Sequence, residues 1–343
     1  MPEPTQDPWT VDETQFPATG SPAEQLRFAL NYAVLAPSGH NTQPWRFKIS
    51  GDAAEVWADR TRALPVVDPE DRELAISCGA ALFHLRIALR HYGFAAATET
   101  LPDANVPDLL ARVHLGGRRS ATPDGQMLFR AITRRRTHRM SFEDREVPGS
   151  QLMELQAAAE EEGAWLHVVR GEPARHAVAD LIAEGDHRQW ADPRFRHELA
   201  AWVHPNRSSS RDGMPGYTFG MGDLASCVGP FILRTFDLGR GVAARDRQIA
   251  EGSPVLAALG ADGDAAAEWL AAGQALARVL LRACVEGVSA SFLNQPIEVP
   301  ELRPRLRALI GRPGFPQLLL RMGYGPEVKP TPRRPVSEVL LAG

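Results

Sequence analysis

The 343-residue sequence predicts an α+β fold of two related halves in tandem, each a mostly antiparallel sheet packed with helices, joined in one chain as a pseudo-dimer. Two observations predict this fold. Two long Ala- and Leu-rich helical segments match each other, so that aligning Gly79 with Gly273 also aligns Gly93 with Gly287. The strand-like runs PWRFKI and AWLHVV are also similar. Chance similarity between two Ala- and Leu-rich helices is the alternative explanation.

A glycine stands inside each of the two matched helices. A glycine in a helix costs about 1 kcal/mol relative to alanine. We therefore expect another part of the chain to approach closely at Gly79 and at Gly273.

The elements of the first half follow from hydrophobic periodicity and turn residues. Apolar residues recur at helical spacing before Pro37, and a long helical pattern ends near Gly93, where a C-cap belongs. Gly51 and Asp52 separate two short alternating runs, as in a hairpin. We expect helices at 22–36 and 68–94, strands at 45–49, 54–58 and 112–115, and a polar linker at 116–125.

The second half begins near Met127 and repeats the mixture of helices and strands. Residues 204–223 are polar and rich in Gly and Pro, and such long loops are usually lids, binding loops or disordered segments. We expect helical segments at 149–164, 174–203 and 265–287, and strands at 165–170, 231–240 and 315–325.

The predicted domain organisation has three parts. Residues 1–20 form a flexible N-terminal segment, because they are acidic and Pro-rich and lack an apolar core. The first half spans residues 21–125, and the second spans 126–343 with a lid-like loop at 204–223.

Composition excludes several classes of function. The formal net charge of −4 gives no electrostatic argument for binding nucleic acid. No stretch approaches the roughly 18 apolar residues of a membrane span, and the N-terminus does not resemble a signal peptide. Cys78, Cys227 and Cys284 are too far apart to suggest a disulfide framework or a metal site. We expect a cytoplasmic protein that contacts neither membrane nor nucleic acid and binds no metal.

Three polar segments are candidates for a binding site: APSGHNTQPWRF at 36–47, TRRRTHRMSF at 133–142 and PTPRRPVSEVL at 330–340. The first is also what an ordinary capped turn would look like. The second holds four arginines within six positions, which repel one another unless an anion lies among them, and arginine binds phosphate bidentately. A solvated basic turn is the alternative for this segment.

These segments resemble the motifs of the nitroreductase family of FMN-dependent oxidoreductases. APSGHNTQPW is similar to that family's APSxxNxQPW motif, RRRTHR to its Arg-Arg-Ser-x-Arg phosphate motif, and MGYGPEVKPTPRRPVSEVL to its closing strand and tail. The double length, together with ISCGAAL, SFLNQP and RDGMPGYTFG, resembles the tandem nitroreductase-like proteins of the Acg subfamily. The resemblance spans about residues 22–340.

The resemblance implies one FMN site per chain. Nitroreductases are usually homodimers in which each of two FMN sites draws residues from both subunits. Here the first half has the Asn-Gln-Pro loop and the second half has the Arg-rich motif and the tail. The halves are therefore complementary, so a monomer would suffice for one site, and a homodimer stays open.

The resemblance also assigns cofactor-binding roles residue by residue. The phosphate and ribityl chain would be held by Arg135, Arg136, Thr137 and Arg139, although Arg134 could equally be the first member of the motif. Arg333 or Arg334 would close around the same dianion. The residues that cross from the first half to the flavin would be Pro37, Ser38, Gly39, His40 and Asn41. Gln43 would reach the ring edge or only fix the loop.

Residues near the reactive flavin nitrogen would be Ser291, Phe292, Asn294 and Gln295. A hydrogen-bond donor there favours the reduced, anionic flavin. The alternative for Asn294 and Gln295 is a helix-following turn before Pro296.

The implied activity is reduction of nitroaromatic, quinone or related acceptors by FMN, with NAD(P)H as electron donor. The flavin carries the chemistry, so no catalytic side chain is expected. The alternative is a lidded FMN-binding or FMN-sequestering protein with little turnover, in which residues 214–221 cover the isoalloxazine face. A third interpretation is a flavin-free protein whose residues 134–139 bind an acidic partner.

Overall fold

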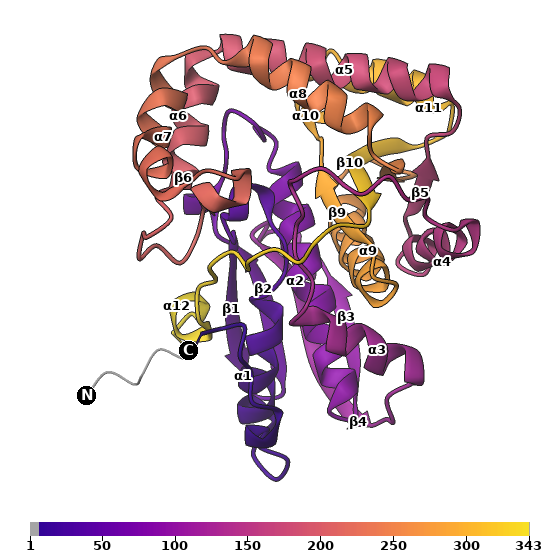
Figure 1. The fold of residues 1–343 in the computed structure, drawn as a ribbon. Helices are drawn as coiled ribbons and strands as arrows, with labels where there is room; N and C mark the ends of the chain where they lie inside the picture. Colours follow the sequence, from indigo (N-terminus) through magenta and orange to yellow (C-terminus); the bar gives the residue numbers. More distant parts are fainter. Residues whose placement is uncertain (1–6, 343) are drawn as a thin grey trace.

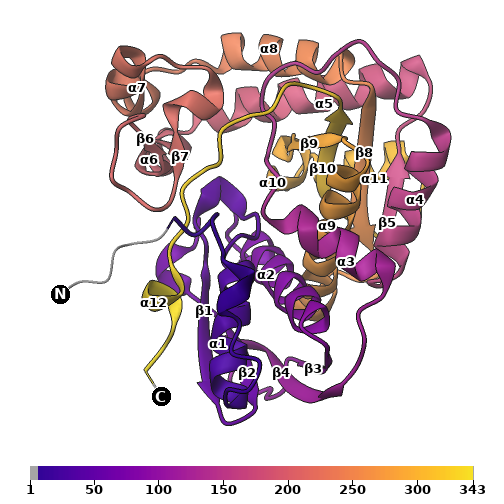
Figure 2. The same cartoon turned by 60° about the horizontal axis from the view of Figure 1, so that its bottom comes forward.

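The computed structural model describes residues 7–342 and contains two four-stranded antiparallel sheets, each packed with helices (Figures 1 and 2). The first sheet has the strand order β1-β2-β4-β3, and the second has the order β5-β8-β10-β9. Each sheet belongs to one part of the sequence, with the first formed before residue 119 and the second after residue 164. The predicted fold class of two antiparallel sheets in tandem is confirmed.

The first sheet contains the predicted hairpin. Strands β1 and β2 pair in register across the turn at Gly51, whose φ of 60° suits glycine. The predicted linker at 116–125 is wrong, because β4 continues to Arg118 to pair with β3, which the sequence analysis missed. The strands of this sheet are β1 (Trp45–Ser50), β2 (Ala53–Ala58), β3 (Phe94–Thr100) and β4 (Leu109–Arg118).

The second sheet has β8 and β10 at its centre, and both are buried along almost their whole length. The predicted strands at 165–170 and 315–325 are confirmed as β5 and β10, whereas β8 and β9 were missed. The strands of this sheet are β5 (Trp165–Val168), β8 (Val255–Ala261), β9 (Ser289–Phe292) and β10 (Phe315–Gly323).

Most predicted helices form close to their expected bounds. Ser21 caps the first one through a capping box with Glu24. The helices that pack around the two sheets are α1 (Pro22–Ala33), α2 (Arg72–His91), α3 (Pro123–Ile132), α4 (Gly149–Glu160), α9 (Ala266–Val285), α10 (Gln295–Glu298), α11 (Arg303–Ile310) and α12 (Val336–Val339).

The two matched helices, α2 and α9, cross directly against each other at their inner glycines. A Cβ atom added to Gly79 would lie 3.0 Å from the Cα of Gly273, and one added to Gly273 would lie 2.9 Å from the Cα of Gly79. The same two Cβ atoms would also clash with the carbonyl oxygens of Leu270 and Ile76. The expected close approach is confirmed, and each glycine is required by its counterpart.

Four helices form an arm that extends over one end of both sheets (Figure 1). Helices α5 and α8 lie side by side along it, and α6 and α7 pack together at its end. The arm consists of α5 (Glu172–Ala191), α6 (Pro193–Trp202), α7 (Asp223–Thr235) and α8 (Gly239–Glu251).

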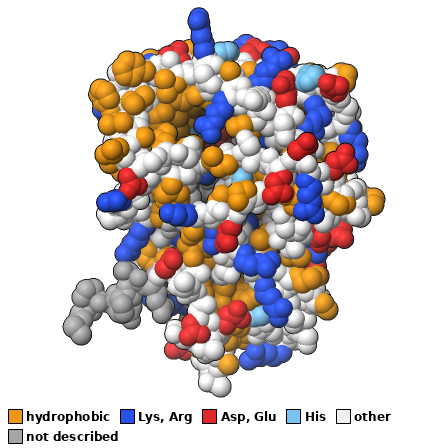
Figure 3. Space-filling view, in the orientation of Figure 1, with side chains coloured by type: hydrophobic (Ala, Val, Ile, Leu, Met, Phe, Trp, Pro, Cys, Tyr) orange, Lys and Arg blue, Asp and Glu red, His pale blue; other side chains and the backbone are white. Residues whose placement is uncertain are grey.

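The strand predicted at 231–240 is wrong, because this segment ends α7 and begins α8. Its apolar residues suggested a strand, but Leu224, Val228 and Phe231 recur at helical spacing and are exposed on α7. Figure 3 shows hydrophobic side chains gathered at the upper left, over this end of the arm.

The C-terminal segment returns from the second half to the first. After β10 the chain runs to α12 and places Leu340 beside Phe47 of β1 in a parallel bridge. The backbone N–H of Leu341 donates to the carbonyl of Phe47 at 2.7 Å. The two halves are therefore connected at residues 119–164 and again by this tail.

The predicted domain boundaries stay a prediction. The boundary at 125/126 falls inside α3, which packs on both α2 and α9. Residues 1–6 of the predicted flexible segment 1–20, and Gly343, lie outside the described residues. Residues 7–20 lie against the body, where the indole of Trp9 donates to the carbonyl of Thr331 at 2.8 Å. None of the helices in residues 7–342 is long and apolar enough to cross a membrane.

Candidate functional site

A cavity of about 310 Å³ lies where the two halves and the arm meet. Most of the residues that the sequence analysis singled out line it: Pro37, Ser38, Gly39, His40, Asn41, Thr137, Arg139, Ser291, Phe292, Asn294, Gln295 and Arg333. A smaller cavity of about 240 Å³ shares Thr137, Arg139 and Thr331 with it and is lined in addition by Arg135 and Arg136. The structure thus brings three distant segments of the sequence to one site.

The loop after α1 enters the cavity with an unusual backbone. His40, Asn41 and Gln43 have φ values of 47°, 56° and 53°, a region that costs a non-glycine residue of order 1 kcal/mol or more. Hydrogen bonds stabilise this conformation: the hydroxyl of Ser38 accepts the N–H of Gln43 at 2.9 Å. The loop therefore has a fixed conformation and forms one wall of the cavity, in addition to reversing the chain as an ordinary turn would.

Asn41 connects this loop to two segments of the second half. Its side-chain amide donates to the carbonyls of Gly213 at 2.9 Å and Pro332 at 3.1 Å. Its side-chain oxygen accepts a hydrogen bond of 2.7 Å from the guanidinium of Arg333. All the hydrogen-bonding groups of this buried side chain are used, so Asn41 fixes the wall of the cavity.

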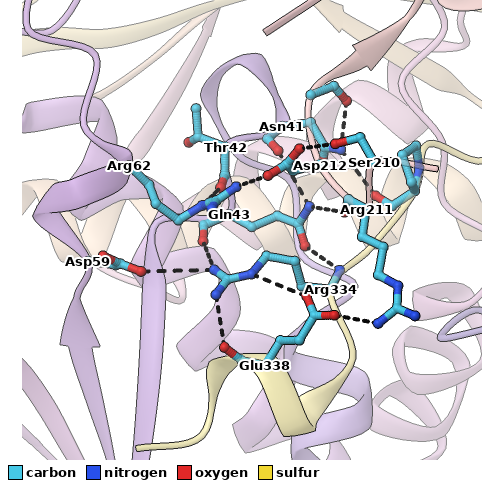
Figure 4. Close-up of polar contacts among 12 residues, drawn as sticks. Asn41, Thr42, Gln43, Asp59, Arg62, Ser210, Arg211, Asp212, Arg334 and Glu338 are labelled. Atoms are coloured by element: carbon cyan, nitrogen blue, oxygen red, sulfur yellow. Dashed lines mark hydrogen bonds and ion pairs between the residues drawn. The ribbon is translucent and has the colours of Figure 1, made fainter. Parts of the chain in front are cut away.

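Two predicted cofactor-binding residues, Gln43 and Arg334, line neither cavity. Both are bonded instead to neighbouring protein groups (Figure 4). The amide of Gln43 donates to the carbonyl of Arg211 at 2.9 Å and accepts the N–H of Arg334 at 2.8 Å. These hydrogen bonds are those that a residue fixing the loop would make, and the role of Gln43 toward a cofactor stays a prediction. The guanidinium of Arg334 lies 3.9 Å from the carboxylate of Asp59 and 3.8 Å from that of Glu338, so its nearest anionic groups belong to the protein.

Four arginines form a cationic cluster at the junction of the two cavities: Arg135 and Arg333, which are buried, and Arg136 and Arg139, which are half-buried. None of them pairs with a carboxylate within the described residues. Each has one buried guanidinium nitrogen without a hydrogen-bond partner there, namely Nε of Arg135, Arg136 and Arg333 and Nη1 of Arg139.

Burial lowers the pKa of Arg135 and Arg139 to about 10 and that of Arg333 well below its usual value, and the neighbouring arginines add to the effect at Arg135 and Arg333. Buried cations that lack a partner are costly. The donor set therefore fits a multivalent anion, which would satisfy these nitrogens together.

The arginine segment is held between α3 and the second sheet. The carbonyl of Ala131, in the last turn of α3, accepts the N–H of Arg135, and Thr137 bridges to Ala290 of β9. The guanidinium of Arg136 stacks on the ring of Trp9 with 4.0 Å to the centroid. Arg134 is exposed whereas Arg135 is buried. Burial therefore favours the register that begins at Arg135.

Residues 291–295 form the end of β9 and the start of α10. The predicted alternative of a helix-following turn is wrong, because the segment follows a strand. The side-chain amide of Asn294 donates to Glu73 at 3.1 Å, and its oxygen accepts the N–H of Leu319 at 3.0 Å. The side-chain amide of Asn294 is therefore used within the protein. Hydrogen bonds from this segment to a ligand in the cavity would come from its backbone or from smaller side chains.

Several acidic groups that no sequence pattern predicted face the same cavity. Asp186, Asp246, Glu73 and Glu298 come from α5, α8, α2 and α10, respectively. Burial raises the pKa of Asp186 to about 8 and that of Glu73 to about 7. No spacing in the sequence distinguishes these residues from solvated carboxylates on helices, because only the tertiary arrangement buries them.

The segment expected to form a lid lies against the loop after α1. Met214 and Phe219 line the cavity, and the N–H of Gly213 donates to the carbonyl of Asn41 at 3.1 Å. The guanidinium of Arg62 contacts Asp212 and the carbonyl of Thr42, which ties this segment to the first half (Figure 4).

No family model matches the chain. It is 33% identical over 326 residues to the "Putative NAD(P)H nitroreductase Rv3131" of Mycobacterium tuberculosis, covering 93% of this chain and 91% of that protein. It is 30% identical over 334 residues to the "Putative NAD(P)H nitroreductase acg" of the same organism, covering 94% and 97%. The FMN-dependent nitroreductase NfnB of Mycobacterium smegmatis, solved in complex with NADPH, matches with a TM-score of 0.40 at 20% identity, covering 64% of this chain and 98% of that one.

Proposed function

This chain belongs to the NAD(P)H nitroreductase family, and on that premise we propose that it is an FMN-dependent oxidoreductase with a single FMN site between its two halves. NAD(P)H is the electron donor, and a nitroaromatic, quinone or related compound is the acceptor. One chain supplies every part of the site, so no second copy is needed to complete it.

The observation that carries the proposal is the cluster of four arginines, each with one buried nitrogen that has no partner in the described part of the chain. A phosphate dianion would accept hydrogen bonds from Arg135, Arg136, Arg139 and Arg333, and the hydroxyl of Thr137 adds a donor at the same junction. The main cavity beside it takes the flat ring system. When bound, the flavin supplies the hydride chemistry.

The protein's own residues then bind, orient and exclude water. The loop at 37–41 forms one wall of the main cavity and the end of β9 another, while Met214 and Phe219 close it on the side of the lid-like segment. Apolar side chains at this position exclude water from a reacting ring, which favours hydride transfer over side reactions.

A visible spectrum of purified, FMN-incubated protein tests the proposal. We expect a bound flavin that is bleached by anaerobic NADH or NADPH, and the faster nucleotide identifies the donor. Flavin that only dithionite bleaches would support the second candidate function, a lidded FMN-binding protein, which is favoured by the position of Met214 and Phe219 at the cavity. Failure to bind FMN at all would contradict both.

The lid-like segment gives a second prediction. Arg62→Ala removes the contacts to Asp212 and to the carbonyl of Thr42, so the segment loses its ion pair to the first half while its hydrogen bonds to Asn41 and Gln43 remain. We expect FMN to dissociate about tenfold faster, as the loss of one hydrogen-bonded charge pair implies, measured by the return of flavin fluorescence on dilution. Arg207→Ala is the control, since Arg207 lies in the same segment but pairs with Asp223 at the surface. Equal rates in both variants would show that the segment does not retain the flavin.

A further inference from the structure

We propose that Asp186 and Asp246 form a second binding position in the main cavity, which takes the cationic, hydrogen-bond-donating group of a flat, mainly apolar ligand. An amidinium or a protonated amine on an aromatic ring has this chemistry. One part of the inference rests on the proposed function, namely that this ligand would lie on the acceptor side of the flavin site.

The two carboxylates are held together by one side chain. The amide nitrogen of Gln295 donates to Oδ1 of Asp186 at 3.1 Å and to Oδ2 of Asp246 at 3.0 Å. Both hydrogens of this amide are therefore used in bridging α5 to α8. The pairing places two like charges side by side at the wall of a cavity, which a structural role alone does not require.

The pair is incompletely satisfied on the side of the cavity. Asp186 is only 2% exposed, and its Oδ2 has no hydrogen-bond partner within the described residues. Oε1 of Gln295 is likewise buried and without a partner there. Both residues line the main cavity. Two neighbouring buried acceptors that lack donors fit a ligand group with several N–H bonds.

The surrounding charges leave Asp186 uncompensated. Burial raises the pKa of Asp246, although Arg245 of α8 and Arg321 of β10 partly oppose this rise, and no ion pair to either carboxylate occurs within residues 7–342. Burial and the nearby Asp246 raise the pKa of Asp186. Glu298 of α10 and Glu73 of α2 also face the cavity, and burial raises the pKa of both. At neutral pH the pair therefore retains a proton, which an arriving cation would displace.

The walls beside the pair suit an aromatic body. Trp190 lies one helical turn after Asp186 on α5, and Phe195, Val242 and Ile249 complete an apolar lining from the rest of the arm. A cation next to an indole ring gains further attraction. Arg139 and Arg333 of the arginine cluster line the same cavity, so it offers both cationic and anionic groups to a ligand.

Three ring compounds of the same shape test the proposal: benzamidine (cationic), benzamide (neutral) and benzoate (anionic). Calorimetric titration into FMN-loaded protein at pH 7 is expected to show benzamidine binding at least tenfold more tightly than the other two. Proton release on benzamidine binding is expected as well, measured as a dependence of the heat on the ionisation enthalpy of the buffer. Asp186→Asn and Asp246→Asn should each lose the preference and the proton release.

The matched control is Asp180→Asn, because Asp180 lies on the same helix but is exposed and pairs with Arg247. It should behave as the wild type. Equal binding of benzamidine and benzamide, or unchanged benzamidine binding in Asp186→Asn, would overturn the inference. Weaker FMN binding in Asp186→Asn would also overturn it, since the pair would then belong to the flavin site. If the wild type binds no FMN, the proposed function fails, and the same titrations on flavin-free protein still decide the inference.

Discussion

Gly273→Ala is expected to lower the free energy of unfolding by about 3 kcal/mol, at the upper end of what overpacking costs. The new Cβ atom would lie 2.9 Å from the Cα of Gly79 and would clash with the carbonyl oxygen of Ile76. Both obstacles are backbone atoms of α2, so a side-chain rotation cannot relieve them. Helix propensity alone would make the alanine variant more stable by about 1 kcal/mol. The clash with α2 therefore predicts destabilisation where propensity alone predicts stabilisation.

Urea unfolding of the wild type and of this variant measures the effect. Gly149→Ala is the control, because Gly149 begins α4 and a Cβ atom there meets nothing within 4 Å. The control should lie within about 0.5 kcal/mol of the wild type or be slightly more stable. A Gly273→Ala variant as stable as the control would mean that α2 and α9 separate easily and that the crossing does not fix the relation of the halves.

Arg139→Met is expected to weaken FMN binding about a hundredfold and to raise the melting temperature of the flavin-free protein. A hydrogen bond to a charged group contributes about 1.5–3 kcal/mol, which corresponds to roughly 10- to 150-fold in affinity. Without an anion, the same guanidinium is a half-buried cation whose buried Nη1 has no partner among residues 7–342, and removing it relieves that cost. Compared with the wild type, the variant should therefore have a higher melting temperature without FMN and a lower one with FMN. A purely structural arginine would not produce this reversal.

Flavin fluorescence quenching gives the affinity, and thermal melts with and without FMN give the two stabilities. Arg134→Met is the control, since Arg134 is exposed and adjacent to the cluster. It should change neither quantity appreciably. If Arg134→Met weakens FMN binding as much as Arg139→Met does, the phosphate motif begins one residue earlier than burial indicates.

The parts of the site that the sequence predicted are those with unusual local composition. The loop at 37–41 combines short polar residues next to an aromatic strand, and the arginine segment would repel itself without an anion. The glycines at 79 and 273 were informative because each contradicts the propensity of its own helix. In each case a local cost in the sequence indicated a tertiary or ligand contact.

The missed parts depend on contacts that no local pattern encodes. Asp186 and Asp246 are ordinary carboxylates on helices until α5 and α8 pack side by side over the cavity. Arg333 and Arg334 are adjacent in sequence, yet only the second meets the carboxylates of Glu338 and Asp59. The strand wrongly predicted at 231–240 is different, because the helical spacing of Leu224, Val228 and Phe231 in α7 was present in the sequence.

The return of the C-terminal tail sets the order in which the site can be completed during synthesis. Thr331 and Arg333 reach the cavity only if the segment beyond β10 is in place, and its far end is fixed by the pairing of Leu340 with Phe47. These partners are separated by almost the whole chain, and such contacts form late. Until this segment folds back, the loop at 37–41 of the first half lacks the support of Arg333. Capture of a ligand at this junction is thus expected to depend on the docking of the tail onto β1.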